Sequence, residues 1–131
     1  MGKTRPPASV VLDTGALIAF ERGDARMRAL VREALRTRGR LVIPAGVLGQ
    51  AWRGSPRQAT LRALVNGPST AVPPLDQPLA EAAGALCGRT GTSDVIDAAV
   101  VLVARREHAL VVTSDVDDLR RLDPTIRAER I

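Results

Sequence analysis

Residues 91–119, GTSDVIDAAVVLVARREHALVVTSDVDDL, decide the fold that this sequence predicts. Thr92 or Ser93 is a favoured N-cap, and the apolar run after it predicts a helix that continues through Arg106. This run is apolar nearly all round, which is typical of a helix buried in a core. Residues 109–112, ALVV, then predict a short buried strand. The stretch therefore indicates a helix and a strand that both belong to the protein interior.

Five aspartates lie at the ends of these elements. Asp94 and Asp97 are three residues apart, so we expect both on one face of the first turn of the helix. Asp115 follows the strand, and Asp117 and Asp118 begin a second helix, where the helix dipole favours negative charge. Capping alone is the alternative interpretation of each aspartate taken singly. The group as a whole predicts a carboxylate cluster.

The rest of the chain alternates between strands and helices. Residues 9–12, SVVL, predict a central parallel strand that delivers Asp13 at its carboxyl end, where α/β sheets build sites. Helices are expected from Ala16, over 25–37, over 45–53, over 55–65, and from Asp76 to about Cys87. A flexible link is expected at 88–91. Further strands are expected at 40–43 and 70–72, with an edge strand at 126–131. This order predicts an α/β three-layer sandwich with a central, mainly parallel sheet. Asp13 and Asp115 would then end strands on the same edge.

Length and composition favour one compact domain over residues 1–131, because a chain with 45% hydrophobic residues can bury a core but is too short for two. The longest apolar run is far below the roughly 18 residues of a membrane helix, and the N-terminal GKTRPPAS lacks a hydrophobic signal region. We therefore expect a cytoplasmic protein with no membrane partner. Cys87, the single cysteine, is expected to be a small buried residue.

The charge balance favours a polyanionic partner. The net charge is +5, with 18 arginines and one lysine, and six of the 14 acidic residues belong to the aspartate set. Arginine pairs bidentately with phosphate, and a basic surface speeds encounter with nucleic acid. An arginine-rich proteome would give the same composition without a functional meaning. With only Phe20 and Trp52 as aromatic residues, a base-stacking sheet surface is not expected.

Aspartates packed together stay ionised only when a cation joins them, since like charges raise each other's proton affinity. The set contains oxygen ligands and no His or Cys, so it predicts Mg²⁺, with Mn²⁺ as the alternative, rather than zinc. Such an ion polarises a phosphoryl group and lowers the pKa of a bound water. The hydroxyls of Thr14 and of Thr113 or Ser114 either orient a ligand or water or are ordinary turn hydroxyls.

Four motifs together resemble the PIN-domain family, and within it the VapC-type toxins of toxin–antitoxin pairs. They are Val11-Leu12-Asp13-Thr14, the helix after Ile43-Pro44, Ser93-Asp94-Val95-Ile96-Asp97-Ala98-Ala99, and Val112-Thr113-Ser114-Asp115. Each motif is weak alone, but the ordered set spans almost the whole chain. The resemblance implies a Mg²⁺-dependent endoribonuclease, typically a homodimer, whose cognate antitoxin inserts its tail into the site.

The resemblance also implies roles for individual residues. It gives Asp13, Asp97 and Asp115 as the catalytic acids and metal ligands, with Asp94 as a further metal ligand and Asp118 and Asp117 as supporting acids. Gln50 departs from the pattern, because the family usually places a glutamate on this helix. A glutamine offers a carbonyl oxygen but no charge. Either Asp94 restores that charge, or metal affinity and activity are reduced or absent.

Two other functions are weighed against a nuclease. One is a non-catalytic partner-binding protein that keeps the fold but lacks competent metal binding because of Gln50. The other is phosphoryl transfer through a covalent aspartate, which is disfavoured because Gly15 stands where haloacid-dehalogenase-like phosphatases need a second aspartate. His108 fits a helix C-terminus better than a catalytic base. Trp52 is interpreted as a core or dimer contact, and Arg53, Arg57 and Arg62 as a solvated helical face or a phosphate track.

Overall fold

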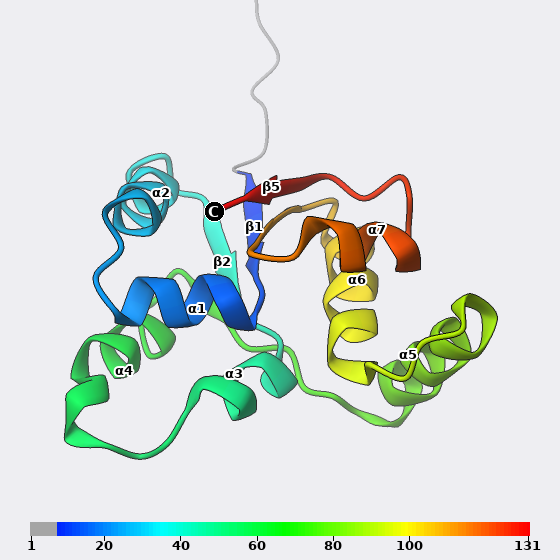
Figure 1. Ribbon diagram of the computed structural model, residues 1–131. Helices are drawn as coiled ribbons and strands as arrows, with labels where there is room; N and C mark the ends of the chain where they lie inside the picture. The colour runs from blue at the N-terminus through cyan, green and yellow to red at the C-terminus, as the bar shows by residue number, and fades with distance from the viewer. Residues whose placement is uncertain (1–7) are drawn as a thin grey trace, which may run out of the picture.

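The computed structural model describes residues 8–131, so the expectation about a signal region falls largely on residues 1–7, outside the described residues. A five-stranded sheet lies between two groups of helices, with α1 to α4 on one side and α5 to α7 on the other (Figure 1). The strands are β1 (Ser9–Leu12), β2 (Arg40–Val42), β3 (Thr70–Ala71), β4 (Leu110–Thr113) and β5 (Ala128–Arg130). The predicted α/β three-layer sandwich is confirmed.

The sheet is parallel throughout, with strand order β3-β2-β1-β4-β5. β1 lies between β2 and β4, and Val11 pairs with Val42 on one side and Val111 on the other. Helices cover both faces of this sheet, which explains why the inner strands are apolar without alternation. Because parallel strands end on one edge, the residues that follow β1 and β4 become neighbours.

Seven α-helices and one 3₁₀ turn connect the strands within the described residues. They are α1 (Thr14–Glu21), α2 (Ala25–Arg36), α3 (Ala45–Ala51), the 3₁₀ turn η1 (Pro56–Gln58), α4 (Ala59–Val65), α5 (Gln77–Thr90), α6 (Val95–Glu107) and α7 (Val116–Leu122). α6 is buried along most of its length and packs against α5, β1 and β4. The prediction that this helix belongs to the core is confirmed, and Cys87 is buried beside it on α5.

Two local predictions were wrong. α6 is capped by Asp94 itself, whose carboxylate accepts the Asp97 amide at 2.9 Å, and not by Thr92 or Ser93. The predicted link at 88–91 continues α5 to Thr90, and Gly91 then adopts a left-handed conformation with φ of 71°. The Thr92 amide donates to the Cys87 carbonyl at 3.1 Å, which is the Schellman closure that a glycine at this position permits. α5 therefore ends sharply at Gly91, and Asp94 caps the start of α6 three residues later.

Smaller differences concern element boundaries. α3 ends at Ala51 instead of continuing to Arg53, and the predicted helix over 55–65 begins as a 3₁₀ turn. β5 is a shorter edge strand than predicted, spanning Ala128–Arg130. In the part of the chain that the structure describes, no helix is both long and apolar enough to cross a membrane.

Candidate functional site

Asp13 follows β1 and is held from two sides. It is buried, with 6% of its surface exposed, and its Oδ1 accepts the Ala16 amide at 2.8 Å as the N-cap of α1. Its Oδ2 accepts the hydroxyl of Thr113, the last residue of β4. The Thr113 hydroxyl in turn accepts the Asp115 amide at 2.8 Å. One buried threonine thus links the ends of the two central strands.

Asp97 and Asp94 approach the same edge from the first turn of α6. The burial of Ala98, Ala99 and Val100 directly behind Asp97 fixes the helix against the sheet. Asp97 is half-buried and Asp94 is exposed. The charge of Asp13, which follows β1, acts on Asp97, and α6 packs against β1, so Asp97 lies near the end of that strand.

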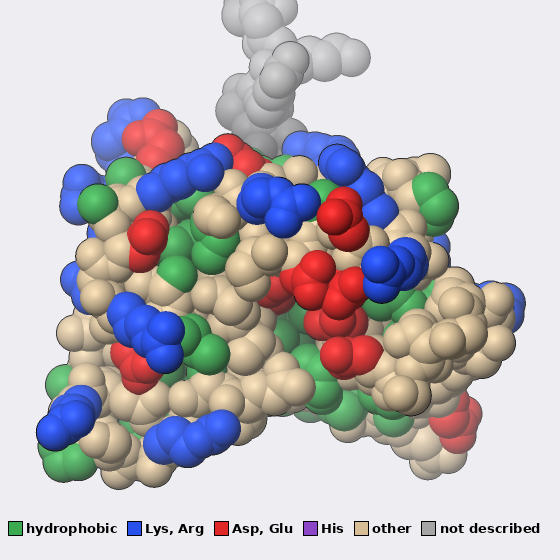
Figure 2. All heavy atoms as spheres, viewed as in Figure 1, with side chains coloured by type: hydrophobic (Ala, Val, Ile, Leu, Met, Phe, Trp, Pro, Cys, Tyr) green, Lys and Arg blue, Asp and Glu red, His purple; other side chains and the backbone are tan. Residues whose placement is uncertain are grey.

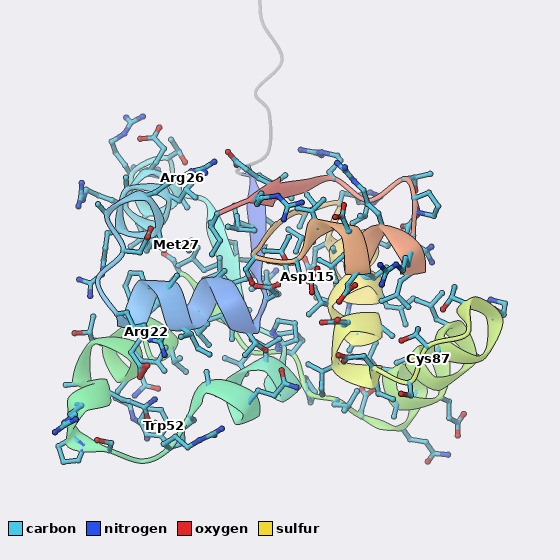
Figure 3. All side chains as sticks on the ribbon, in the orientation of Figure 1. Arg22, Arg26, Met27, Trp52, Cys87 and Asp115 are labelled. Carbon is cyan, nitrogen blue, oxygen red and sulfur yellow. The ribbon has the colours of Figure 1, made fainter. Side chains whose placement is uncertain are left out.

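α7 contributes the remaining acids with different orientations. Asp115 is exposed at the N-terminus of α7, and its side chain makes no cap hydrogen bond. Figure 3 shows Asp115 at the centre of the molecule, between the two groups of helices. Asp118 is one turn further on and pairs with Arg121 at 2.7 Å. Asp117 is 78% exposed and lies 3.8 Å from Arg130, so the structure does not bring it into the cavity described next.

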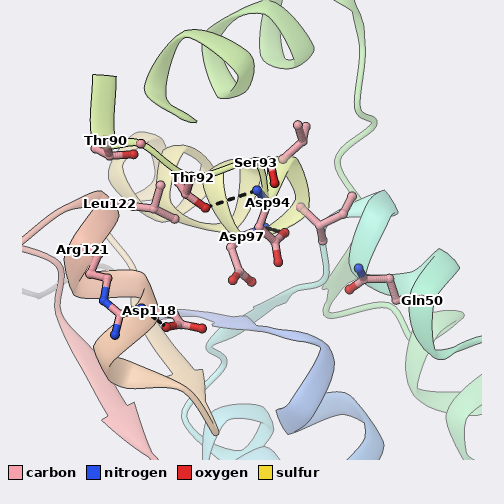
Figure 4. A pocket seen from close by; sticks show the side chains of 12 residues that line it. Gln50, Thr90, Thr92, Ser93, Asp94, Asp97, Asp118, Arg121 and Leu122 are labelled. Carbon is pink, nitrogen blue, oxygen red and sulfur yellow. Dashed lines mark hydrogen bonds and ion pairs between the residues drawn. The ribbon is translucent and has the colours of Figure 1, made fainter. Parts of the chain in front are cut away.

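A cavity of about 910 Å³ opens beside these carboxylates (Figure 4). Its lining includes Gln50 from α3, Asp94 and Asp97 from α6, and Asp118 and Arg121 from α7. Acidic side chains gather in a hollow at the middle of this face, and arginines are spread around it (Figure 2). Asp13 and Asp115 do not line the cavity; both follow the strands at its edge.

Gln50 reaches the cavity because α3 packs closely on α6. A Cβ at Gly46 would clash with the terminal Cδ1 of Ile96, so a larger residue there would require the end of this side chain to turn away. The Gln50 Oε1 accepts the hydroxyl of Thr14. Thr14 thus orients the Gln50 amide, and the amide stands on the opposite side of the carboxylates from Arg121 (Figure 4).

The carboxylates perturb one another. Burial, the charge of Asp94 and a hydrogen bond with it, followed by the charges of Asp13 and Asp118, raise the pKa of Asp97 to about 7. Burial also raises the pKa of Asp13, and Asp115 adds to the rise, although the Thr113 hydroxyl and the Ala16 amide oppose it. A hydrogen bond shared with Asp115 raises the pKa of Asp118. These five aspartates therefore form one electrostatically coupled group.

The donor set fits a hard divalent cation. It consists of carboxylates and the Gln50 amide, and a cation among them would offset the burial and the mutual repulsion that raise the pKa of Asp97. Within residues 8–131, no group of three or more Asp, Glu, His or Cys side chains is already arranged to hold a metal ion. The fit thus rests on the chemistry of the ligands and their charge, and binding would draw the side chains together.

Metal-free protein is expected to lose stability as the pH rises from about 4 to about 7. The pKa of Asp97 is about 7 in the folded chain and 3.8 ordinarily, so the folded chain binds the proton more tightly and its advantage disappears as Asp97 ionises. Thermal melts in chelator across this range test the slope, which Asp97→Asn should flatten. The pKa of Asp123 is lowered by Thr125 and Arg105 against the effect of burial, so its ionisation changes the stability only at pH values below this range. An identical slope in the variant would contradict the assignment.

Two features of the cavity were not singled out from sequence. Arg121 enters its lining, and the only sequence signal was the i, i+3 spacing from Asp118. The turn between α5 and α6 adds Thr90, Thr92 and Ser93 to the lining, whereas the sequence suggested Thr92 or Ser93 only as a helix cap. His108 is exposed, in a left-handed conformation at the end of α6, away from this cavity.

Trp52 and the arginines near it lie in a different region. Trp52 is partly buried against the core between α3 and α4, where Figure 3 labels it. The guanidinium of Arg62 stacks over its ring at 4.3 Å, and Arg53 donates to the Trp52 carbonyl at 2.7 Å. These contacts occupy two of the three arginines considered as a phosphate track.

The chain was compared with known proteins. The model of the PIN domain matches residues 10–123. No curated protein sequence matches the chain. Similar solved structures include VapBC2 from Rickettsia felis, bound to a DNA fragment from their promoter, with a TM-score of 0.69, 15% identity, and coverage of 94% of this chain and 98% of that one.

Two further structures have the same fold. The Mycobacterium tuberculosis VapC20 structure, described as a sarcin-ricin loop cleaving toxin, gives a TM-score of 0.68 at 19% identity, covering 93% of this chain and 99% of that one. FitAcB from Neisseria gonorrhoeae gives 0.60 at 18% identity, covering 91% and 95%.

Proposed function

The chain belongs to the PIN-domain family, and from this premise we propose that it is a Mg²⁺-dependent endoribonuclease, the toxin of a type II toxin–antitoxin pair. The observation that carries the proposal is the coupled group of Asp13, Asp97 and Asp115 with Asp94 and Asp118, drawn from three elements to one sheet edge. Mn²⁺ would serve the same ligands.

Asp13, Asp97 and Asp115 would hold the metal, with Asp94 as a further ligand and Asp118 as a supporting acid. When bound, the metal supplies polarisation of the scissile phosphate and a water of lowered pKa. The protein's own residues preorganise this site. Thr113 fixes the Asp13 carboxylate, Asp94 caps the helix that carries Asp97, and Thr14 orients Gln50. None of these contacts requires the substrate, so they restrain Asp13, Asp97 and Gln50 before RNA arrives, and the metal would then draw the carboxylates together.

The partners and location remain part of this proposal. VapC20 is described as cleaving the sarcin-ricin loop, which supports an RNA substrate for a chain of the same fold. The likeness to the VapBC2 structure supports a cognate antitoxin. A homodimer is part of the proposal because the resemblance to the VapC-type toxins implies one. We place the activity in the cytoplasm, where such an RNA substrate is found.

Cleavage of total RNA by the purified chain tests the proposal directly. We expect fragments to appear with Mg²⁺, to disappear with EDTA, and to return when excess Mg²⁺ is added, because the carboxylates need a cation to act on a phosphodiester. The protein must be prepared free of any bound antitoxin. Cleavage that persists unchanged in EDTA, or none with either metal, would reject a metal-dependent ribonuclease.

Gln50→Glu is expected to strengthen metal binding by a few-fold and to raise cleavage at limiting Mg²⁺. The substitution adds a carboxylate to the cavity wall that already carries Asp94 and Asp97, and its oxygens still accept the Thr14 hydroxyl. A Mg²⁺ titration of the cleavage rate measures the effect, with Gln77→Glu, an exposed site on α5, as the matched control. Equal curves for wild type and Gln50→Glu would show that Gln50 does not limit metal binding.

A partner-binding protein without activity is the second candidate, and Gln50 is the observation that favours it. This reading predicts no cleavage by wild type under any metal, and a gain of activity only in Gln50→Glu. The same titration therefore separates the two functions.

A further inference from the structure

The cavity extends beyond the carboxylates toward the turn between α5 and α6. Thr90, Thr92 and Ser93 line it there, and Arg121 and Leu122 of α7 line it nearby (Figure 4). The Thr92 hydroxyl accepts the Asp94 amide at 3.3 Å, so its own proton is available to a ligand oxygen. This extension has neutral donors and one cation, whereas the carboxylate end offers acceptors.

Arg121 is the one Lys or Arg side chain that lines this cavity in the described part of the chain. Its side chain is 76% exposed, and its partner Asp118 is 42% exposed. Ion pairs this exposed contribute little to stability, so breaking this one costs little. By contrast, Arg105 pairs with an Asp123 side chain only 5% exposed, which marks a structural role.

A phosphodiester that enters this cavity lies beside the negative charges of Asp94, Asp97 and Asp118, and Arg121 is the one Lys or Arg among the described residues that line it. An arginine guanidinium can bind a phosphate through two parallel hydrogen bonds. With Asp118, Arg121 makes one, from Nη1 to Oδ1 at 2.7 Å. Arg121 and Gln50 stand on opposite sides of the carboxylates (Figure 4). An RNA strand that crosses the carboxylates from Gln50 toward the α5–α6 turn would bring one of its phosphates to Arg121.

We propose that Arg121 binds a backbone phosphate of the RNA next to the cleaved bond, exchanging its ion pair with Asp118 for the phosphate. This inference rests on the proposed function. Arg121 acts as a positioning residue, because it contacts the substrate away from the reacting atoms.

RNA binding in an inactive background tests the contact. In the Asp97→Asn chain, anisotropy of a short fluorescent single-stranded RNA should show about tenfold weaker binding for Arg121→Gln, the effect of a lost charge-assisted contact. The slope of log affinity against log salt should fall by about 0.7, the value for one phosphate on a single strand. Arg120→Gln, on the adjacent exposed residue outside the cavity lining, is the matched control and should leave both unchanged.

Asp118→Asn separates a phosphate contact from a merely structural role. If Arg121 only steadies Asp118, both substitutions break the same pair and weaken binding alike. If Arg121 binds phosphate, Asp118→Asn removes its competitor and a like charge, so binding strengthens while Arg121→Gln weakens it. Melting curves of each variant confirm that the fold is intact.

The outcomes distinguish this inference from the proposed function. Equal binding by Arg121→Gln and Arg120→Gln, beside RNA cleavage by wild type, would overturn the contact and leave the nuclease proposal standing. An Arg121-specific loss of binding and salt slope supports the contact, and it does so even if wild type fails to cleave RNA, a result that would reject only the nuclease.

Discussion

Asp97→Asn is expected to lower the rate of RNA cleavage by about two to three orders of magnitude. A catalytic metal contributes several kcal/mol of transition-state stabilisation, and each factor of ten corresponds to about 1.4 kcal/mol. Asp97 is the carboxylate coupled most widely, to Asp94, Asp13 and Asp118, so it is central to the charge that would hold the ion. Single-turnover cleavage of RNA at saturating Mg²⁺ measures the loss.

The substitution is expected to leave the fold intact. The bond that caps α6 runs from the Asp97 backbone amide to Asp94, so it does not involve the replaced side chain. Asparagine also keeps the volume of aspartate while removing its charge. Asp76→Asn is the matched control, since Asp76 is an exposed helix cap on α5 and asparagine caps equally well. If wild type and Asp97→Asn cleave alike, the activity does not come from this site, and the partner-binding reading gains.

The candidate site could be predicted from the residues that follow the apolar strands. Asp13 and Asp115 each follow an apolar run, and a parallel sheet carries both to one edge once β1 and β4 pair. The pairing of these strands was a condition in the sequence argument, since nothing local fixes strand order. The structure supplies it through Leu12 and Val112, which lie in register.

Side-chain direction was beyond the reach of sequence. Asp117 and Asp118 are adjacent, yet one turns toward Arg130 and the other lines the cavity, because successive residues of a helix are about 100° apart. Arg121 lies on the same face as Asp118, one turn later. The choice of which face meets the cavity depends on how α7 packs, through Leu119 and Leu122, against the core. That packing is a tertiary property.

Thr113→Val is expected to destabilise the protein by about 1–3 kcal/mol and to reduce RNA cleavage strongly. Thr113 is fully buried, and its hydroxyl donates to Asp13 and accepts the Asp115 amide. Valine has nearly the same shape but no hydroxyl, so the buried Asp13 carboxylate loses a donor that opposes the rise in its pKa. Leaving a buried acceptor without its partner costs its full desolvation. Urea unfolding of the metal-free protein measures the stability, and single-turnover cleavage measures the activity.

Thr113→Ser provides the matched comparison, because it removes the methyl group and keeps the hydroxyl. We expect it to retain most of the activity, with a stability loss limited to the lost methyl packing, about 1 kcal/mol. Activity should therefore follow the hydroxyl, while stability follows both groups. If Thr113→Val cleaves RNA as fast as Thr113→Ser, the hydroxyl does not position Asp13 for catalysis. Its bond to Asp13 would then serve only to join β1 and β4.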